Sequence, residues 1–324
     1  MKFLIVGLGS MGKRRARLLK RISPEAEILG VDTSPERRAE AEGLGIRPFE
    51  SIGAAAAEGP RAAFVCTAPL SHRAIIGELL GRDLPVFTEL NLVQDGYEEL
   101  MAEAERRGLL LFLSSTMLYR REIAYMKERV SACDKPVSYI YHIGQYLPDW
   151  HPWENYQNFF VGDARTSGCR EIFGVELPWL IDTFGPVERV QAVKDKVTDL
   201  ATTYPDRFFV TLEHRGGAKG MLAVDVVCPK AVRNLEIFAE GMHLFWEGNP
   251  KALYTFDKEA GDKVFVDTYG SFERDARYSD NIVENAYSDE LLNFLAALDG
   301  REEPLYSFEK DLETLSVIDR IEIG

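Results

Sequence analysis

A glycine-rich loop directly after the first apolar run constrains this chain more than any other feature of its sequence. The loop reads Gly-Leu-Gly-Ser-Met-Gly from Gly7 to Gly12, follows the strand-like segment 2–6 and precedes a helix-like stretch. In a strand–turn–helix context, Gly7 permits the tight turn, Gly9 lets backbone approach a pyrophosphate, and Gly12 lets helix and strand pack closely. The sequence therefore predicts a dinucleotide-binding Rossmann unit at its start.

Residues 1–118 repeat the same alternation of short apolar runs and helix-like stretches. The expected strands are nearly continuous apolar runs, as strands covered on both faces require. They are 2–6, 27–31, 62–67, 85–88 and 109–113, and the expected crossover helices are 11–21, 35–44, 72–80 and 97–107. We therefore expect an α/β domain with a doubly wound parallel sheet.

Residues 119–324 differ in character and predict a second domain of the α+β class. Helix-like stretches lie at 119–130, 170–184 and 287–298, and another ends the chain; apolar, strand-like runs lie at 137–145, 187–193, 208–214, 220–227, 236–239 and 243–246. Because most of these runs follow one another closely, we expect a large, mostly antiparallel sheet with one open face.

Composition excludes several classes of partner. The net charge of -14 and the scattered Lys and Arg residues disfavour nucleic acids and anionic membranes, which require a basic face. The sequence contains no long apolar segment, no spaced His or Cys pairs for a metal, and four distant cysteines, namely Cys66, Cys133, Cys169 and Cys228. We expect a cytoplasmic protein with reduced thiols, a small-molecule partner and no metal.

Further residues of the expected cofactor site lie near the loop and after the second strand. Ser10 and Met11 lie where the expected helix begins, and their backbone N–H groups can bind phosphate oxygens. Asp32 ends the second strand, near the offset at which an acid receives the adenosine ribose hydroxyls, which favours NAD. Arg37 and Arg38 leave NADP possible, because a guanidinium can pair with a 2'-phosphate.

A second loop, 66–72, leaves the carboxyl end of a later strand, the edge at which doubly wound sheets bind ligands. Thr67 and Pro69 are expected to contact the cofactor. Alternatively, this loop is a simple turn in which Ser71 caps the next helix. His72 is a candidate cofactor contact, with a surface position in the first helical turn as its alternative.

With this order of parts, the sequence resembles the Gfo/Idh/MocA oxidoreductases. The resemblance spans nearly the whole chain and rests on the loops 7–12 and 66–72, the segment Val86-Phe87-Thr88-Glu89-Leu90-Asn91, Tyr119-Arg120, the stretch 144–152, and Tyr287 with Glu290. It implies hydride exchange between tightly held NAD(P) and a hydroxyl or keto group. The stretch 144–152 looks like members from cell-surface polysaccharide clusters, which act on sugars or nucleotide sugars.

The resemblance also implies a Glu-Lys-Pro motif that this chain lacks. The motif reads Glu89-Leu90-Asn91 here, so the expected amine is replaced by an apolar side chain that cannot carry a proton. Glu89 remains a candidate cofactor contact. The loss indicates either a rearranged proton relay or a non-redox member that binds a nucleotide or a sugar.

The family places an Asp and a His on the helix after a glycine cluster, and these residues are also replaced. Ungapped alignment puts Ile172 in the first slot and Val175 or Glu176 in the second. Gly174 favours Glu176 for the second slot. Four residues are candidate replacements for the missing proton carrier: Glu176, Glu171, His151 and Tyr119. Glu171 and Glu176 are roughly 140° apart on a helix, so at most one faces a cleft, and a salt-bridged Glu176 is the alternative.

The loop around His151 is the expected substrate contact. Trp150 beside it suits the apolar face of a sugar, and Asp149 and Glu154 can accept hydrogen bonds from hydroxyls. Tyr156 is included in this candidate surface. Alternatively, the loop packs its aromatic side chains against its own domain or a neighbouring subunit. The resemblance implies a homodimer or homotetramer formed through the open sheet.

Overall fold

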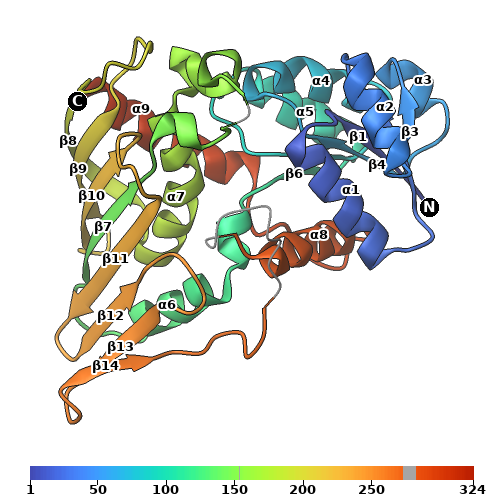
Figure 1. Ribbon diagram of the computed structural model, residues 1–324. Coiled ribbons are helices and arrows are strands. Elements are labelled where there is room, and N and C mark those ends of the chain that lie inside the picture. The colour runs from blue at the N-terminus through green and yellow to red at the C-terminus, as the bar shows by residue number, and fades with distance from the viewer. Residues whose placement is uncertain (153, 273–281) are drawn as a thin grey trace. The chain divides into compact units, whose positions relative to one another are not determined.

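The structure, a computed structural model, describes residues 1–152, 154–272 and 282–324, and the chain divides into two compact units (Figure 1). The first unit contains Met1–Ser115 and Tyr287–Leu312, and the second contains Thr116–Ala286 and Glu313–Gly324. The first segment therefore ends close to the expected boundary at residue 118. The first unit also takes in residues 287–312, which the sequence had assigned to the second domain.

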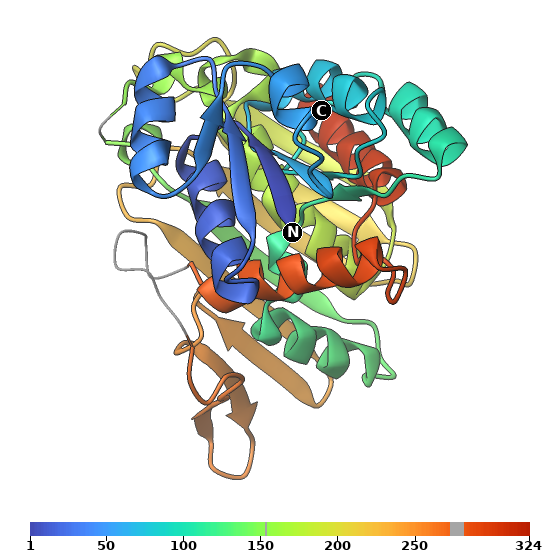
Figure 2. The same ribbon diagram turned by 90° about the vertical axis from the view of Figure 1, so that its right-hand side faces the viewer.

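The first unit contains a six-stranded parallel sheet in the order β3-β2-β1-β4-β5-β6, with helices on both faces (Figure 1, Figure 2). Its strands are β1 (Lys2–Val6), β2 (Glu27–Val31), β3 (Arg47–Phe49), β4 (Ala62–Val65), β5 (Val86–Thr88) and β6 (Leu111–Leu113). Its helices are α1 (Ser10–Ile22), α2 (Pro35–Gly43), α3 (Ile52–Ala56), α4 (His72–Leu80) and α5 (Tyr97–Arg107). The expected doubly wound α/β fold is confirmed, and strand order reverses between β1 and β4, where such sheets bind ligands.

Residues near the end of the sequence complete the core that covers this sheet. Helix α8 (Glu284–Leu298) places Phe294 against Phe64, Phe87 and Phe112 on three adjacent strands, with ring centroids 5.1 to 5.4 Å apart. All four rings are fully buried. Edge-to-face contacts of this kind add to the free energy of burying the rings themselves. The Rossmann sheet is therefore closed on one face by residues that come after most of the second unit.

The second unit contains an eight-stranded sheet in the order β14-β13-β12-β11-β7-β10-β9-β8. Its strands are β7 (Ser138–Gly144), β8 (Val187–Asp195), β9 (Arg207–His214), β10 (Lys219–Asp225), β11 (Val232–Ala239), β12 (Met242–Trp246), β13 (Leu253–Asp257) and β14 (Asp262–Phe265). Its helices are α6 (Arg121–Ser131), α7 (Gly168–Phe184) and most of α9 (Phe308–Ile323). Among the described strands of this second sheet, only β7 and β10 pair in parallel, so the expected mostly antiparallel sheet is confirmed.

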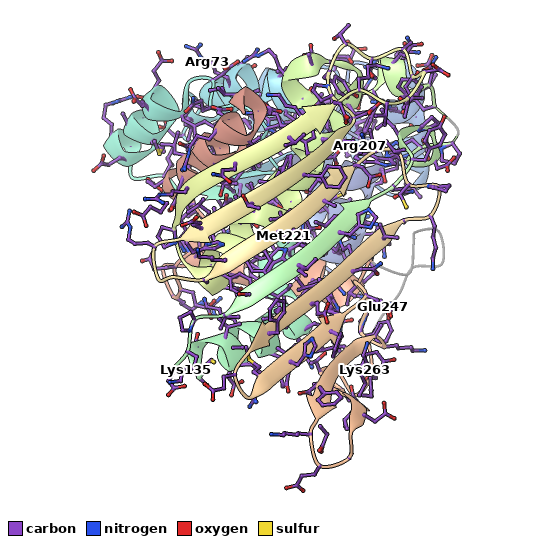
Figure 3. The ribbon with its side chains drawn as sticks, turned by 90° about the vertical axis from the view of Figure 1, so that its left-hand side faces the viewer. Arg73, Lys135, Arg207, Met221, Glu247 and Lys263 are labelled. Carbon is purple, nitrogen blue, oxygen red and sulfur yellow. The ribbon has the colours of Figure 1, made fainter. Side chains whose placement is uncertain are left out.

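The two faces of this sheet differ. Helix α7 packs on one face, where Trp179 meets Tyr141 and Phe173 meets Phe208. The other face shows strands without a covering helix in the part of the chain that is drawn, with Met221 near its centre (Figure 3). Alternation along β10 explains the difference, because successive side chains point to opposite faces.

Candidate functional site

The three loop glycines occupy three different environments, all in the first unit. Gly7 has φ +96°, and a Cβ there would lie 2.6 Å from the Cys66 carbonyl oxygen. A Cβ on Gly12 would lie 1.9 Å from the Gly7 carbonyl oxygen, whereas a Cβ on Gly9 would meet no atom of the described residues within 4 Å. Gly7 and Gly12 are therefore needed for the turn and its packing, and Gly9 borders open space.

The N-terminus of α1 is suited to an anion. Gly9 is its N-cap and no side chain caps the helix, while its first turn contains no acidic residue. Lys13 N–H is the first amide bonded back to the cap, at 3.0 Å from the Gly9 carbonyl oxygen. Backbone amides at such a helix start, together with the helix dipole, favour a phosphate. The open space at Gly9 lets the pyrophosphate of a dinucleotide reach them, so these residues fit the cofactor.

Asp32 is attached to the same loop. Its Oδ2 accepts a hydrogen bond from Leu8 N–H at 2.8 Å, and its Oδ1 accepts one from Ser34 N–H at 2.9 Å. The guanidinium of Arg37 lies 3.8 Å from Oδ2, and Arg38 donates to the Asp32 carbonyl oxygen at 2.7 Å. The carboxylate is thus fixed beside the glycine loop, where an acid would receive ribose hydroxyls, with a cation next to it.

The loop after β4 contacts the glycine loop, because a Cβ on Gly7 would lie 2.9 Å from the Thr67 methyl carbon. Pro69 begins a short 3-10 turn, Pro69–Ser71, at this strand edge. The Ser71 hydroxyl donates to Thr67 Oγ1 at 2.8 Å and does not cap α4 with its side chain. The alternative in which Ser71 caps α4 is therefore not seen, and its hydroxyl bonds to Thr67 instead.

His72 is buried, with 2% of its surface exposed, so the alternative of a surface position is wrong. Burial lowers its pKa, which favours the neutral ring. Nε2 then donates to the Thr67 carbonyl oxygen at 2.9 Å, and Nδ1 faces the Asn91 side chain and the Thr88 hydroxyl. Asn91, at the proline position of the lost motif, thus connects the segment after β5 to the loop after β4.

Glu89 lies at the carboxyl end of β5, and its N–H donates to the Val65 carbonyl oxygen at 2.9 Å. Its Oε1 accepts a hydrogen bond from Arg15 Nε at 2.6 Å. Sequence reasoning did not identify Arg15. Its spacing in the sequence could have pointed to it, because Gly12, Arg15 and Leu19 recur at helical intervals on the buried face of α1.

The candidate residues of the second unit differ in how their polar atoms are used. Glu176 is fully buried, and its carboxylate accepts hydrogen bonds from Tyr141 Oη and Trp179 Nε1 at 2.8 Å each and from Arg233 Nε at 2.7 Å. The salt-bridged alternative for Glu176 therefore describes its geometry. A proton-carrying role for Glu176 remains a prediction that would require these bonds to rearrange.

Glu171 presents the opposite case on the same helix. The residue is half-buried, but its Oε2 is shielded from solvent and has no hydrogen-bond partner among the residues that the structure describes. Burial raises the pKa of Glu171 to about 8. Near neutral pH this group therefore keeps a proton that it could donate.

The loop around His151 is more exposed. The His151 ring packs at 4.4 Å from the Phe159 ring, and burial lowers its pKa. Trp150 Nε1 donates to the Gln145 carbonyl oxygen at 2.9 Å, and the Tyr156 hydroxyl accepts from Ala201 N–H at 3.0 Å. Asp149 and Glu154 are exposed and Tyr119 is half-buried in a short 3-10 turn, Thr116–Tyr119. The aromatic members thus brace the loop, and its carboxylates face solvent.

Within residues 1–152, 154–272 and 282–324, no group of three or more His, Cys, Asp or Glu side chains could hold a metal ion. The four cysteines are free thiols. None of the helices described is long and apolar enough to cross a membrane.

Residues 1–115 match the model of the Gfo/Idh/MocA family, an oxidoreductase family with an NAD-binding Rossmann fold. The chain matches none of the curated proteins with which it was compared.

Solved structures match over nearly the whole chain. UDP-N-acetylglucosamine 3-dehydrogenase GnnA from Acidithiobacillus ferrooxidans is 18% identical with a TM-score of 0.77, covering 100% of this chain and 97% of its own. An oxidoreductase from Agrobacterium radiobacter in complex with NAD+, L-tartaric acid and magnesium is 14% identical with a TM-score of 0.82. The match covers 100% of this chain and 96% of that protein. The WlbA dehydrogenase from Bordetella pertussis, in complex with NADH and UDP-GlcNAcA, is 18% identical with a TM-score of 0.75, covering 99% and 95%.

These similarities agree with the cofactor and fold expected from the sequence. Residues 1–115 are thus similar to the NAD-binding Rossmann domain of the Gfo/Idh/MocA oxidoreductase family, and the chain as a whole has the fold of these solved structures.

Proposed function

We propose that this chain is an NAD-dependent oxidoreductase acting on a hydroxyl or keto group of a sugar or nucleotide sugar. The observation that carries the proposal is the uncapped start of α1, which borders open space at Gly9 and lies beside the fixed carboxylate of Asp32. This combination provides a phosphate site and a ribose acceptor at one edge of the sheet. NADP remains possible because Arg37 lies next to Asp32.

In this proposal the chain's own residues bind and orient the cofactor. The amides of Ser10 and Met11 hold the pyrophosphate, and Asp32 holds the adenosine ribose. Thr67, Pro69 and Glu89 contact the other half of the dinucleotide. His72 holds the Thr67 loop in place through its hydrogen bond to the Thr67 carbonyl oxygen. NAD, when bound, supplies the group that accepts a hydride from substrate carbon.

The proton that accompanies hydride transfer requires a carrier other than Leu90. Glu176, His151 and Tyr119 are the predicted carriers, and Glu171 is a fourth candidate. The raised pKa of Glu171 favours it as an acid near neutral pH, because it retains a proton there. Glu176 is disfavoured because both of its carboxylate oxygens are already bonded, one of them to Arg233.

The substrate class is supported by the printed names of two similar structures, a UDP-N-acetylglucosamine 3-dehydrogenase and a dehydrogenase with UDP-GlcNAcA. The exposed carboxylates of Asp149 and Glu154 suit hydroxyl groups, and Trp150, His151 and Tyr156 suit sugar faces. A role in cell-surface polysaccharide synthesis is consistent with this class. The free cysteines fit a reducing compartment, and we place the protein in the cytoplasm.

A second candidate function is a non-redox module that binds a nucleotide or a sugar. Leu90 and the fully engaged carboxylate of Glu176 favour it, because both positions lack an available proton carrier.

Binding and turnover separate the two candidates. We expect NADH to bind the purified protein, measured by quenching of tryptophan fluorescence, and Asp32→Ala to weaken binding about tenfold through the lost charge-assisted hydrogen bonds. A panel of sugars and nucleotide sugars should then interconvert NAD and NADH at 340 nm. Binding without turnover on the whole panel, with gain of activity in Leu90→Lys, would support the non-redox module instead. Absence of NADH binding by the folded protein would exclude the oxidoreductase and leave only a module that binds a sugar or another nucleotide.

A second copy of the chain is the proposed partner of the open sheet face. Exposed apolar side chains from neighbouring strands lie in register there, with Val193 opposite Phe209 and Ile140 opposite Met221. Their exposed fractions are 69%, 52%, 45% and 57%, respectively, and contiguous apolar surface of this kind usually has a partner. We therefore propose a homodimer or homotetramer formed through this face.

Sedimentation velocity tests the assembly. We expect the wild type to sediment as a dimer or larger at micromolar concentration and Met221→Glu to shift it to a monomer, because a buried unpaired charge opposes association. Val197→Glu is the matched control, since Val197 is exposed and apolar but lies outside the strands. A monomeric wild type, or equal effects of both variants, would contradict this interface.

A further inference from the structure

Arg15 joins two carboxylates inside the first unit. Its side chain is fully shielded from solvent, and its Nε donates to Glu89 Oε1 at 2.6 Å. Its Nη2 donates to Glu290 Oε2 at 2.7 Å and to the Ser114 hydroxyl at 3.2 Å. The guanidinium also lies 4.6 Å from the centre of the Phe87 ring. Four elements, α1, β5, α8 and the end of β6, therefore meet at one cation.

The charges in this cluster stabilise one another. Burial alone would lower the pKa of Arg15, but the carboxylates of Glu89 and Glu290 outweigh it and raise that pKa, so the guanidinium stays charged. Burial raises the pKa of Glu290, against the opposing effect of Arg15. Breaking one partner from such a buried pair leaves an uncompensated charge, so the three side chains hold a single arrangement.

The two carboxylates differ in exposure and in their other contacts. Glu290 is fully buried, and its Oε1 also accepts hydrogen bonds from the Ser114 hydroxyl at 2.9 Å and Ser115 N–H at 2.8 Å. Glu89 keeps 13% of its side chain exposed at the carboxyl end of β5. That end of a doubly wound sheet is the edge that binds ligands. Glu290 therefore anchors the cluster from inside, and Glu89 is the member that can reach a bound molecule.

We propose that Arg15 is a positioning residue of the cofactor site, which holds the Glu89 carboxylate in one orientation as an acceptor for a hydroxyl of the bound dinucleotide. This inference rests on the proposed function, in which Glu89 contacts the cofactor. The next residue, Leu90, has no charge and stands where the lost motif has its lysine. The cation bonded to Glu89 is Arg15, which lies on α1. Because the N-terminus of α1 also receives the pyrophosphate, one rigid helix sets both contacts.

NADH affinity of variants in the cluster tests the proposal, with tryptophan fluorescence as the readout. The double variant Arg15→Met/Glu290→Gln removes the cation without leaving the inner carboxylate charged. We expect the double variant to bind NADH about tenfold more weakly than the wild type, because Glu89 is no longer held in its orientation.

Further variants separate positioning from general support of the fold. Glu89→Gln should weaken binding about tenfold in the wild type, yet cause little further loss in the double variant, whereas a merely structural role of Arg15 would leave the two losses additive. Arg15→Lys should keep most of the wild-type affinity, because an ammonium can still bond to Glu89, and this variant provides the test if the double variant does not fold. The matched control is Arg47→Met/Glu58→Gln, which removes an exposed ion pair of 2.9 Å in the same unit.

The outcomes are distinguishable. A wild type that binds NADH, with the same affinity in Arg15→Met/Glu290→Gln or with additive losses on combination with Glu89→Gln, overturns this inference and leaves the proposed function intact. A folded wild type that binds no NADH overturns both.

Discussion

Gly12→Ala is expected to destabilise the first unit by about 3 kcal/mol and to abolish NADH binding. The new Cβ would lie 1.9 Å from the Gly7 carbonyl oxygen and 3.2 Å from a methyl carbon of Ile5. A backbone oxygen cannot move aside without displacing the turn, so α1 must shift away from β1. Thermal unfolding and NADH titration of the purified variant measure the two effects.

Two other glycines provide matched controls for the same one-carbon change. In the described part of the chain, no atom lies within 4 Å of a Cβ on Gly9, so Gly9→Ala should cost less than about 1 kcal/mol of stability. It should still weaken NADH binding at least about tenfold, because its methyl group occupies the space that a pyrophosphate needs. Gly43→Ala, at the end of α2 and also open, should leave binding unchanged and stabilise by about 0.5 kcal/mol. Equal losses of affinity in all three variants would contradict the proposed phosphate site.

Glu176→Gln is expected to destabilise the second unit by about 3 kcal/mol. Three donors, from Tyr141, Trp179 and Arg233, converge on the two carboxylate oxygens. An amide offers one oxygen in place of two, so at least one donor must face an NH2 group. Urea unfolding of the variant at neutral pH measures the loss.

Glu171→Gln makes the same chemical change five residues earlier on α7, with a different expected result. The carboxyl of Glu171 has a pKa raised from 4.5 to about 8 by burial. Between these values the folded state holds a proton that the unfolded state has released, so wild-type stability falls as pH rises, by up to about 1.4 kcal/mol per unit. The glutamine variant lacks this slope. Its free energy of unfolding relative to that of the wild type should therefore rise by up to about 3 kcal/mol between pH 5 and 7.5. A pH-independent difference would contradict the raised pKa.

Much of the first unit was predictable because its constraints are local. The loop 7–12 needs glycines for reasons that act within a few residues or across one adjacent strand, as the contacts of Gly7 and Gly12 confirm. The strands β1 and β2 have the expected bounds, since continuous apolar runs mark strands covered on both faces. The three-residue strand β3 gives too short a pattern to be recognised, and it was missed.

The site was less predictable because its partners lie far apart in sequence. Nothing local shows that Arg15 meets Glu290, or that Asn91 meets His72. An arginine on the inward face of α1 signals a buried counter-charge without saying which carboxylate supplies it. The motif that the family resemblance supplied identified which residues were lost, and only the three-dimensional contacts show what the replacements bind.

The return of residues 287–312 to the first unit has a consequence for how this protein can be made. During synthesis, the sheet of the first unit emerges early, but Phe294 and Glu290 leave the ribosome only after nearly all of the second unit. Until then the aromatic face on β4, β5 and β6 lacks its cover, and the guanidinium of Arg15 lacks one of its two carboxylates. The core of the nascent Rossmann unit therefore stays incomplete until residues 287–312 have been synthesised. Its exposed apolar surface favours chaperone binding or aggregation during that time.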